Sequence, residues 1–165
     1  VDDDAIIVEQ TPKFTVDVLK EGKLVTKGIP KDKLCSIQLY PEAYRSTWYF
    51  RKLTGLLENP IGELKVHFAV PGMKLTIFEG DKKNAKGLVP EKTPETVVKA
   101  GEIGITNMSA KNMGLIGIRS EDNHEFGPTA ESFSATNIVG LVCSNFEIIE
   151  KLKEGEILYV TESMS

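Results

Sequence analysis

The sequence is poor in the residues that bind metals or form disulfides. Its 165 residues include two histidines and two cysteines, Cys35 and Cys143, which lie far apart in the chain. Cysteines so few and so widely spaced form neither a disulfide framework nor a Cys-x-x-Cys pair. We therefore expect both to be buried free thiols in a reducing cytoplasm.

Basic clusters and long apolar runs are also missing. The formal net charge is −4, and the sequence contains no run rich in Lys or Arg. Nucleic acids and anionic membranes are bound through a basic field, so neither is an expected partner. The apolar runs are far shorter than the roughly 20 residues needed to span a bilayer. We expect a cytoplasmic domain.

Motifs for phosphate and acyl chemistry are absent as well. The sequence has no glycine-rich phosphate loop, no Gly-x-Ser-x-Gly and no dinucleotide fingerprint. Residues 121–125 (Glu-Asp-Asn-His-Glu) combine carboxylates with an imidazole, which several divalent ions accept as ligands. No second histidine lies nearby, and the spacing matches no recognised site. We predict a solvated loop there and no bound metal or cofactor.

What the sequence does contain is a series of short segments with strand periodicity. In each of them apolar and polar residues alternate with a period of two, or a short apolar run is bounded by turn residues. The segments are residues 14–18, 24–26, 34–40, 64–68, 74–79, 102–107, 113–119, 136–142 and 157–161.

Two further segments have helix signals. Pro41 suits a helix start, where its fixed φ and missing N–H cost little, and Gly55 suits the stop. Asn145 is a preferred N-cap residue before a second helix at 146–153. The buried stripe of the first helix is expected to contain Trp48, Phe50 and Leu53.

Many short strands and two helices predict a mainly β fold. We expect a closed antiparallel β-barrel of about eight strands with two capping helices, because closure removes exposed strand edges. The length suits one domain, which we place at residues 14–165. Residues 1–13 are expected to be an N-terminal extension or linker. Because the first residue is Val, we expect the domain to be part of a longer protein.

Residues 66–73 (Val-His-Phe-Ala-Val-Pro-Gly-Met) resemble a strand and turn of the cyclophilins, the peptidyl-prolyl isomerases. The family pattern is Phe-His-Arg-x-x-Pro-Gly-Phe, and its Arg is the main catalytic side chain. His67, Pro71 and Gly72 stand at the family positions, whereas Phe68 replaces the Arg. Weaker resemblances extend the match over most of the chain, at residues 14–25, 37–53, 101–107 and 137–142.

The resemblance also implies a binding groove in which most family side chains are replaced. Thr76 falls near the family Gln, Met73 and Gly117 near two pocket Phe residues, and Thr136 near the pocket-wall His. The Trp-Leu pair falls near Glu131 and Ser132. The predicted groove comprises His67, Phe68, Met73, Thr76, Asn107, Gly117, Phe133 and Thr136. On its apolar strand, His67 is expected to make one buried hydrogen bond rather than to act in catalysis.

Catalysis is therefore expected to be weak. Loss of one preorganised charge costs roughly 100- to 1000-fold in rate, and Phe68 can neither carry charge nor donate a hydrogen bond. We expect no catalytic residue in this chain. An active isomerase remains the alternative, and a small-ligand-binding barrel is a further alternative.

Four other segments resemble methanogenesis marker protein 3 of methanogenic archaea: residues 97–107, 114–119, 126–129 and 135–140. That family is longer than this chain and contains cyclophilin-like domains. The resemblance implies a binding or scaffold module in the assembly or activation of methyl-coenzyme M reductase, with protein partners in a multi-subunit complex.

Phe126, Gly127, Pro128 and Thr129 form a candidate partner loop. Glycine permits a turn, proline stiffens it, and the loop follows a barrel strand, where binding groups often lie. A partner-recognition edge and a well-packed turn are both compatible with this sequence.

Overall fold

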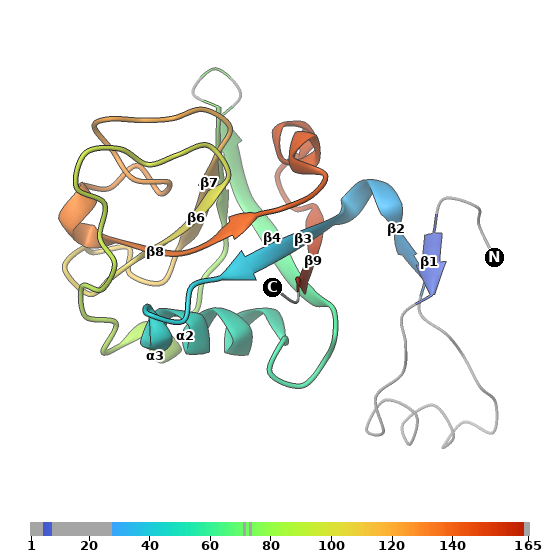
Figure 1. The fold of residues 1–165 in the computed structure, drawn as a ribbon, viewed down its shortest axis with the longest axis horizontal. Coiled ribbons are helices and arrows are strands. Elements are labelled where there is room, and N and C mark those ends of the chain that lie inside the picture. The colour runs from blue at the N-terminus through green and yellow to red at the C-terminus, as the bar shows by residue number, and fades with distance from the viewer. Residues whose placement is uncertain (1–4, 8–27, 71, 73, 164–165) are drawn as a thin grey trace.

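The computed structural model describes residues 5–7, 28–70, 72 and 74–163, and its architecture is mainly β (Figure 1). The predicted strands at 14–18 and 24–26 lie outside the described residues, as do Pro71 and Met73. The predicted binding role of Met73 therefore stays a prediction.

Seven strands close into a barrel, which confirms the predicted fold class. Their order around the barrel is β3-β8-β6-β7-β5-β4-β9. The strands are β3 (Leu34–Leu39), β4 (Gly62–Val70), β5 (Leu75–Phe78), β6 (Glu102–Thr106), β7 (Ile116–Arg119), β8 (Thr136–Val142) and β9 (Ile157–Glu162).

The barrel is mixed rather than purely antiparallel. β9 pairs with β3 in parallel, with Leu34 opposite Tyr159 and Ile37 opposite Glu162, and the other six neighbouring pairs are antiparallel. A closed ring of strands can alternate in direction throughout only if their number is even. Seven strands therefore require one parallel pair, and here it joins the first and last strands of the barrel.

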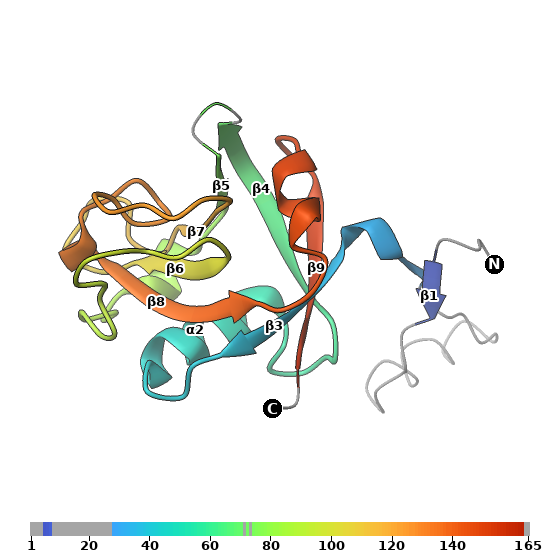
Figure 2. The ribbon, with the colours of Figure 1, turned by 45° about the horizontal axis from the view of Figure 1, so that its top comes forward.

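A separate two-stranded sheet precedes the barrel. β1 (Ala5–Ile7) pairs with β2 (Gly28–Pro30), and the 3₁₀ helix η1 (Lys31–Lys33) leads from β2 into β3. This small sheet lies to one side of the barrel in both Figure 1 and Figure 2. Part of the predicted N-terminal extension is thus a strand.

The barrel interior is filled mainly by aliphatic side chains. The isoleucines of β6 and β7 (Ile103, Ile105, Ile116 and Ile118) belong to the core and are at most 1% exposed. Each such side chain contributes about 1.5–3 kcal/mol through the hydrophobic effect. Because side chains alternate across a strand, the residues between these isoleucines face outward.

The helix α2 (Tyr44–Thr54) covers one end of the barrel, and it buries a different aromatic residue from the one predicted. Phe50 is buried as expected, but Trp48 is 46% exposed and Tyr49 is fully buried instead. The Tyr49 hydroxyl donates to the Gly114 carbonyl at 2.7 Å and accepts from the Asp81 N–H at 2.8 Å. A tyrosine can be buried when its hydroxyl is satisfied in this way.

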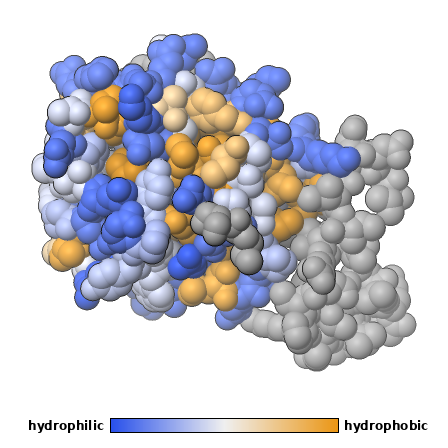
Figure 3. Space-filling model, viewed as in Figure 1, coloured by the Kyte–Doolittle hydropathy of each residue, from blue (hydrophilic) through white to orange (hydrophobic). Residues whose placement is uncertain are grey.

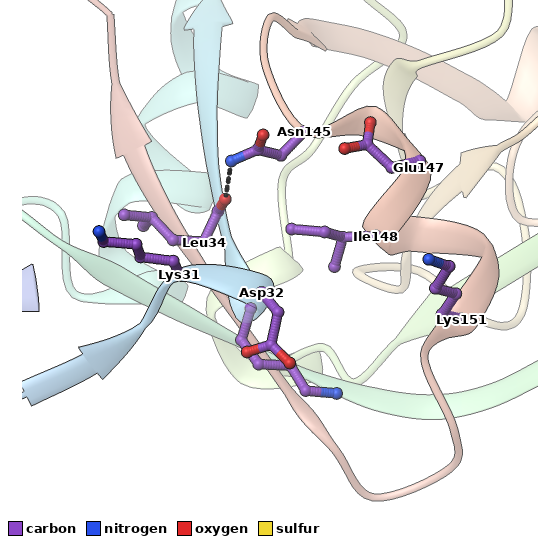
Figure 4. Close-up of a pocket in the computed structure, with 8 residues that line it drawn as sticks. Lys31, Asp32, Leu34, Asn145, Glu147, Ile148 and Lys151 are labelled. Carbon is purple, nitrogen blue, oxygen red and sulfur yellow. Dashed lines mark hydrogen bonds between the residues drawn. The ribbon is translucent and has the colours of Figure 1, made fainter. Parts of the chain in front are cut away.

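The second predicted helix is a 3₁₀ helix, η4 (Phe146–Lys151). Asn145 does not cap it, because Asn145 has left-handed backbone (φ 56°) and its side chain makes no capping bond. The Asn145 amide donates instead to the Leu34 carbonyl at 3.0 Å, which ties η4 to the start of β3 (Figure 4).

The two cysteines differ in exposure, so the prediction that both are buried is wrong for Cys143. Both are free thiols, but Cys143 follows the last residue of β8 and is exposed. Cys35 points into the core, where burial and then the charge of Glu147 raise the pKa of its thiol to about 11.

The surface seen in Figure 3 mixes hydrophobic and hydrophilic residues. Patches of both kinds are interspersed over this face. Across the part of the chain that the structure describes, none of the helices has the length and apolar character that crossing a membrane requires.

Candidate functional site

The outer face of the barrel carries two adjacent glycines, Gly104 on β6 and Gly117 on β7. They are direct partners in the strand pairing, and each stands between two core isoleucines of its own strand. Both glycines therefore face outward. Without side chains, they leave the backbone of this part of the sheet open to close contact by another segment.

The loop after β7 makes this contact. An ideal Cβ on Gly104 would lie 2.7 Å from the Pro128 ring, and a Cβ on Gly117 would overlap the Pro128 carbonyl. Gly127 in turn lies so close to Thr136 of β8 that a Cβ there would overlap the Thr136 side chain. We call residues 126–129 the Gly-Pro segment. Its residues 127–129 are buried, and only Phe126 is exposed.

Hydrogen bonds fix the Gly-Pro segment on the barrel. The Gly127 N–H donates to the Glu131 carbonyl at 2.8 Å, and the Ala130 N–H donates back to the Gly127 carbonyl at 2.9 Å. The hydroxyls of Thr129 and Thr106 form a buried bond of 2.6 Å. The segment is thus a well-packed turn, and its role as a partner loop stays a prediction.

Arg119 completes this arrangement, and the sequence interpretation missed it. It lies on the outward side of β7, two residues from Gly117, and is only 3% exposed. Its Nε donates to the Gly127 carbonyl at 3.2 Å, which is the carbonyl of the Gly127–Pro128 amide. Burial lowers the pKa of its guanidinium. The sequence signal was a charged residue ending an otherwise apolar strand.

Among the residues that the structure describes, no hydrogen-bond partner is found for the terminal nitrogens of Arg119. Among the described residues, the Gly127 carbonyl is the one hydrogen-bond acceptor of this guanidinium. No side-chain nitrogen or oxygen in that part of the chain is both fully buried and without a partner.

Phe68 shares this outward side of the sheet. It is opposite Ile77 in the β4–β5 pairing, and Phe78 on the alternate side belongs to the core. Phe68 is 38% exposed, and the ring of His67 meets its edge with centroids 5.6 Å apart. His67 itself is exposed, so the expectation that it makes a buried hydrogen bond is wrong; the β4 pairing shifts at this point.

Thr76 and Asn107 point away from the Gly-Pro segment. Thr76 lies on the same side of β5 as Phe78, and its hydroxyl donates to the Ile149 carbonyl at 3.3 Å inside the barrel. Asn107 is fully buried, where its amide donates to the Ser134 carbonyl and to the Asn137 side chain.

The predicted groove residues therefore separate into three groups. Gly117 and Thr136 meet at the Gly-Pro segment, and both are covered by it. His67 and Phe68 are exposed on β4, and Phe133 is half-buried at the start of the 3₁₀ helix η3 (Phe133–Ala135). Thr76 and Asn107 have structural partners inside the protein. Ligand binding by any of these residues stays a prediction.

A hollow of about 580 Å³ lies between η1 and η4 (Figure 4). Its walls include three lysines, two acidic residues and two aliphatic ones, and these charges do not converge on one point. The lining residues are Lys31, Asp32, Lys33, Leu34, Asn145, Glu147, Ile148 and Lys151.

Two of the three carboxylates of the acidic loop at 121–125 form ion pairs. Glu121 pairs with Lys74 at 3.3 Å and Asp122 with Lys99 at 3.5 Å. Within the described ranges, no three His, Cys, Asp or Glu side chains come together in a way that would hold a metal ion.

Two relatives from methanogens resemble this chain over nearly its whole length. The UPF0288 protein of Methanothermobacter thermautotrophicus is 59% identical over 162 residues, which are 98% of this chain and 31% of that protein. The UPF0288 protein of Methanococcus aeolicus is 48% identical over 160 residues, which are 95% of this chain and 32% of that protein. The chain thus spans about a third of the length of these relatives.

A solved structure supports the fold. The crystal structure of an uncharacterized B. cereus protein superposes with a TM-score of 0.57 at 16% identity, covering 90% of this chain and 37% of that one. Residues 35–163, from β3 to the end of β9, match the family described as "Putative peptidyl-prolyl cis-trans isomerase domain". The chain belongs to this family of isomerase-type domains.

Proposed function

We propose that this chain is a protein-binding module that keeps the barrel of a prolyl isomerase domain and has lost efficient catalysis. The observation that carries the proposal is the Gly-Pro segment. Pro128 packs against the backbone of Gly104 and Gly117, and the carbonyl of the Gly127–Pro128 amide accepts the Arg119 hydrogen bond. The chain's own proline thus covers the part of the outer face where these two glycines provide no side chains.

The chemistry of isomerisation supports this proposal. Rotation about a peptide bond has a barrier of about 18–20 kcal/mol, which falls only if the amide loses double-bond character. A catalyst needs a charged donor beside the prolyl amide and an apolar floor beneath its ring. Phe68 supplies no charge, and the guanidinium of Arg119 already binds an amide of its own chain.

The proposed setting is a cytoplasmic assembly in methanogens. We take the barrel to be cyclophilin-like and the partners to be proteins, with methyl-coenzyme M reductase or its activation components as the foremost candidates. Two observations support this setting: the relatives come from methanogens, and the chain covers about a third of each, as expected for a domain of a larger protein. Phe68, which is exposed beside His67, offers an apolar contact for such a partner.

Affinity purification of the complete native protein tests the proposed setting. The tagged protein should enrich subunits of methyl-coenzyme M reductase or of its activation machinery, measured by quantitative mass spectrometry against an untagged strain. We expect Phe68→Asp to lower this enrichment several-fold, because truncating central apolar contacts costs more than 1 kcal/mol at interface hot spots. Leu57→Asp is the matched control, because Leu57 is also exposed but follows α2.

Two results would contradict the setting. One is recovery of no reductase or activation component above the untagged strain. The other is equal enrichment by wild type and Phe68→Asp, which would remove β4 from the interface.

One observation favours a second candidate, a working isomerase. Arg119 shows that a guanidinium on this face can reach the carbonyl of a Gly–Pro amide. If the Gly-Pro segment left the sheet, Arg119 could act on the prolyl amide of another chain. An isomerisation assay with wild type and Arg119→Leu separates the two candidates.

A further inference from the structure

A second surface with binding character lies between α2 and the segment that follows the short helix α3 (Lys82–Ala85). It is a groove of about 410 Å³. We call it the aromatic groove, and it is lined by Tyr44, Arg45, Trp48, Asn84, Lys86, Gly87 and Leu88.

Two aromatic side chains are unusually exposed in this groove. Tyr44 is 70% exposed and Trp48 is 46% exposed, although the neighbouring Tyr49 and Phe50 are fully buried. Tyr44 and Trp48 are four residues apart, so they lie next to each other along one face of α2. Tyrosine and tryptophan are enriched at protein interfaces, because one part of each ring system is apolar and another forms hydrogen bonds.

The helices beside the groove carry an excess of basic residues in a chain that is acidic overall. α2 and α3 together contain Arg45, Arg51, Lys52, Lys82 and Lys83 and no Asp or Glu, and Lys86 follows directly. Arg51 is ion-paired with Glu162 at 2.8 Å, so the other basic residues supply this excess. The whole chain has 24 acidic and 20 basic residues. Two carboxylates lie close to the groove, and both are hydrogen-bonded within the protein. Asp81 caps α3 by accepting from the Lys83 and Asn84 N–H groups, and Glu91 accepts from the N–H and hydroxyl of Ser46 on α2, both at 2.6 Å.

The groove is also held in shape without a partner. Arg45 donates to the Gly87 carbonyl at 2.6 Å, which fixes the far wall to α2. Gly87 has φ of 90°, a left-handed conformation that suits glycine. On the other side, the Lys52 ammonium lies 5.4 Å from the centroid of the Trp48 ring. A preformed site spends less binding free energy on ordering itself.

We propose that the aromatic groove docks an acidic, amphipathic peptide segment of a protein partner. An apolar side chain of the segment packs between Tyr44 and Trp48, and its carboxylates meet the ammonium groups of Lys86 and its neighbours. This inference does not depend on the Gly-Pro segment or on the proposed loss of catalysis, because it concerns another part of the surface.

A peptide fits these observations better than a nucleic acid. Aromatic and basic side chains also bind single-stranded RNA, but such proteins present a positive groove that follows the strand over several nucleotides. Here the basic side chains beside the groove lie on the short elements α2 and α3 and at Lys86, and the whole chain has a net charge of −4. The residues that line the groove also include Leu88, a core residue whose edge adds apolar surface.

Intrinsic fluorescence gives a direct test, because Trp48 is the only tryptophan of the chain. The probe is a synthetic helical peptide with Leu at positions i, i+3, i+4 and i+7 and Glu at most other positions. We expect a saturable change in Trp48 emission that weakens as salt is raised, because salt screens exposed charge pairs. The comparison ligands are the same peptide with Lys in place of Glu and a single-stranded RNA oligonucleotide.

Variants inside and outside the groove distinguish docking in the groove from nonspecific electrostatic attraction of the acidic peptide to lysines elsewhere on the surface. Lys86→Glu and Tyr44→Ala are each expected to weaken binding about tenfold, which corresponds to about 1.4 kcal/mol. Lys153→Glu makes the same charge change on an exposed residue beyond η4, and it should leave the affinity within about twofold. Circular dichroism spectra of all variants check that the barrel is intact.

Any of four results would overturn the proposal. These are no saturable emission change with the Glu peptide, equal binding of the Lys peptide, tighter binding of the RNA, or equal effects of the Lys86 and Lys153 substitutions.

Discussion

Gly117→Ala is expected to lower the free energy of unfolding by about 1–3 kcal/mol, the usual cost of forcing extra volume into a packed region. The added methyl group would overlap the Pro128 carbonyl, which is backbone and cannot rotate away. The Gly-Pro segment must therefore move off the sheet or the strands must separate. Because Gly117 has an ordinary φ, the effect comes from this overlap and not from backbone strain.

Chemical denaturation measures the loss, and hydrogen exchange locates it. The Gly127 and Ala130 amides, which are hydrogen-bonded within the loop, should exchange much faster in Gly117→Ala than in wild type. Gly72→Ala is the control, because a Cβ at Gly72 meets nothing within 4 Å. Its effect should stay within about 0.5 kcal/mol. Equal stability of the two variants would show that Pro128 does not pack on the sheet as described.

Tyr49→Phe is expected to be the other large effect, at about 2–4 kcal/mol of lost stability. The change removes one hydroxyl and leaves two backbone groups without their partner, the Gly114 carbonyl and the Asp81 N–H. A buried polar group that loses its partner costs about 1–3 kcal/mol. Tyr44→Phe removes the hydroxyl of a 70% exposed tyrosine on the same helix and should change stability by no more than about 0.5 kcal/mol.

The same tyrosine predicts a dependence of stability on pH. Burial raises the pKa of Tyr49 from 10.0 to about 12, so the folded state favours the neutral phenol. A group whose pKa is raised on folding stabilises the protein fully below its unfolded pKa and loses this contribution as pH rises through the folded value. Wild type should therefore lose stability between about pH 10 and pH 12, and Tyr49→Phe should lack this component. An identical pH profile for both proteins would mean that the Tyr49 hydroxyl is not buried.

Strand periodicity was sufficient to predict the barrel, because the core needs apolar residues at every second position. Residues 102–107 and 113–119 show this clearly, with their isoleucines inside and glycines between them. The parallel pairing of β3 with β9 could not be read from periodicity, because alternation within a strand carries no information about the direction of its neighbour.

The site was harder to predict because it depends on register. The pairing of β4 and β5 shifts between Val66 and Phe68, and a shift of one residue exchanges the two faces of a strand. Phe68 therefore lies on the outward side, whereas Thr76, which the family resemblance placed with it, lies inside the barrel. The prediction that Trp48 rather than Tyr49 is buried failed for a different reason. The partners of the Tyr49 hydroxyl, Gly114 and Asp81, lie far along the chain and could not be identified from the helix sequence.

The packing of the Gly-Pro segment on the sheet could be recognised only from tertiary contacts. The sequence indicated a stiff turn, but Gly104, Gly117 and Thr136 are separated from Pro128 by loops and strands. Arg119 was missed for the same reason, because its partner is a backbone carbonyl that no sequence motif marks.

If the chain's own Gly127–Pro128 amide occupies the outer face, the domain should lack efficient catalysis. The most direct measurement is the cis–trans exchange rate of an X-Pro tetrapeptide, followed by NMR with and without the protein, with an active cyclophilin as the positive control. We predict the uncatalysed exchange, which takes tens to hundreds of seconds at 25 °C. Acceleration by the wild-type chain that disappears in Arg119→Leu would contradict the proposed loss of catalysis and establish the isomerase.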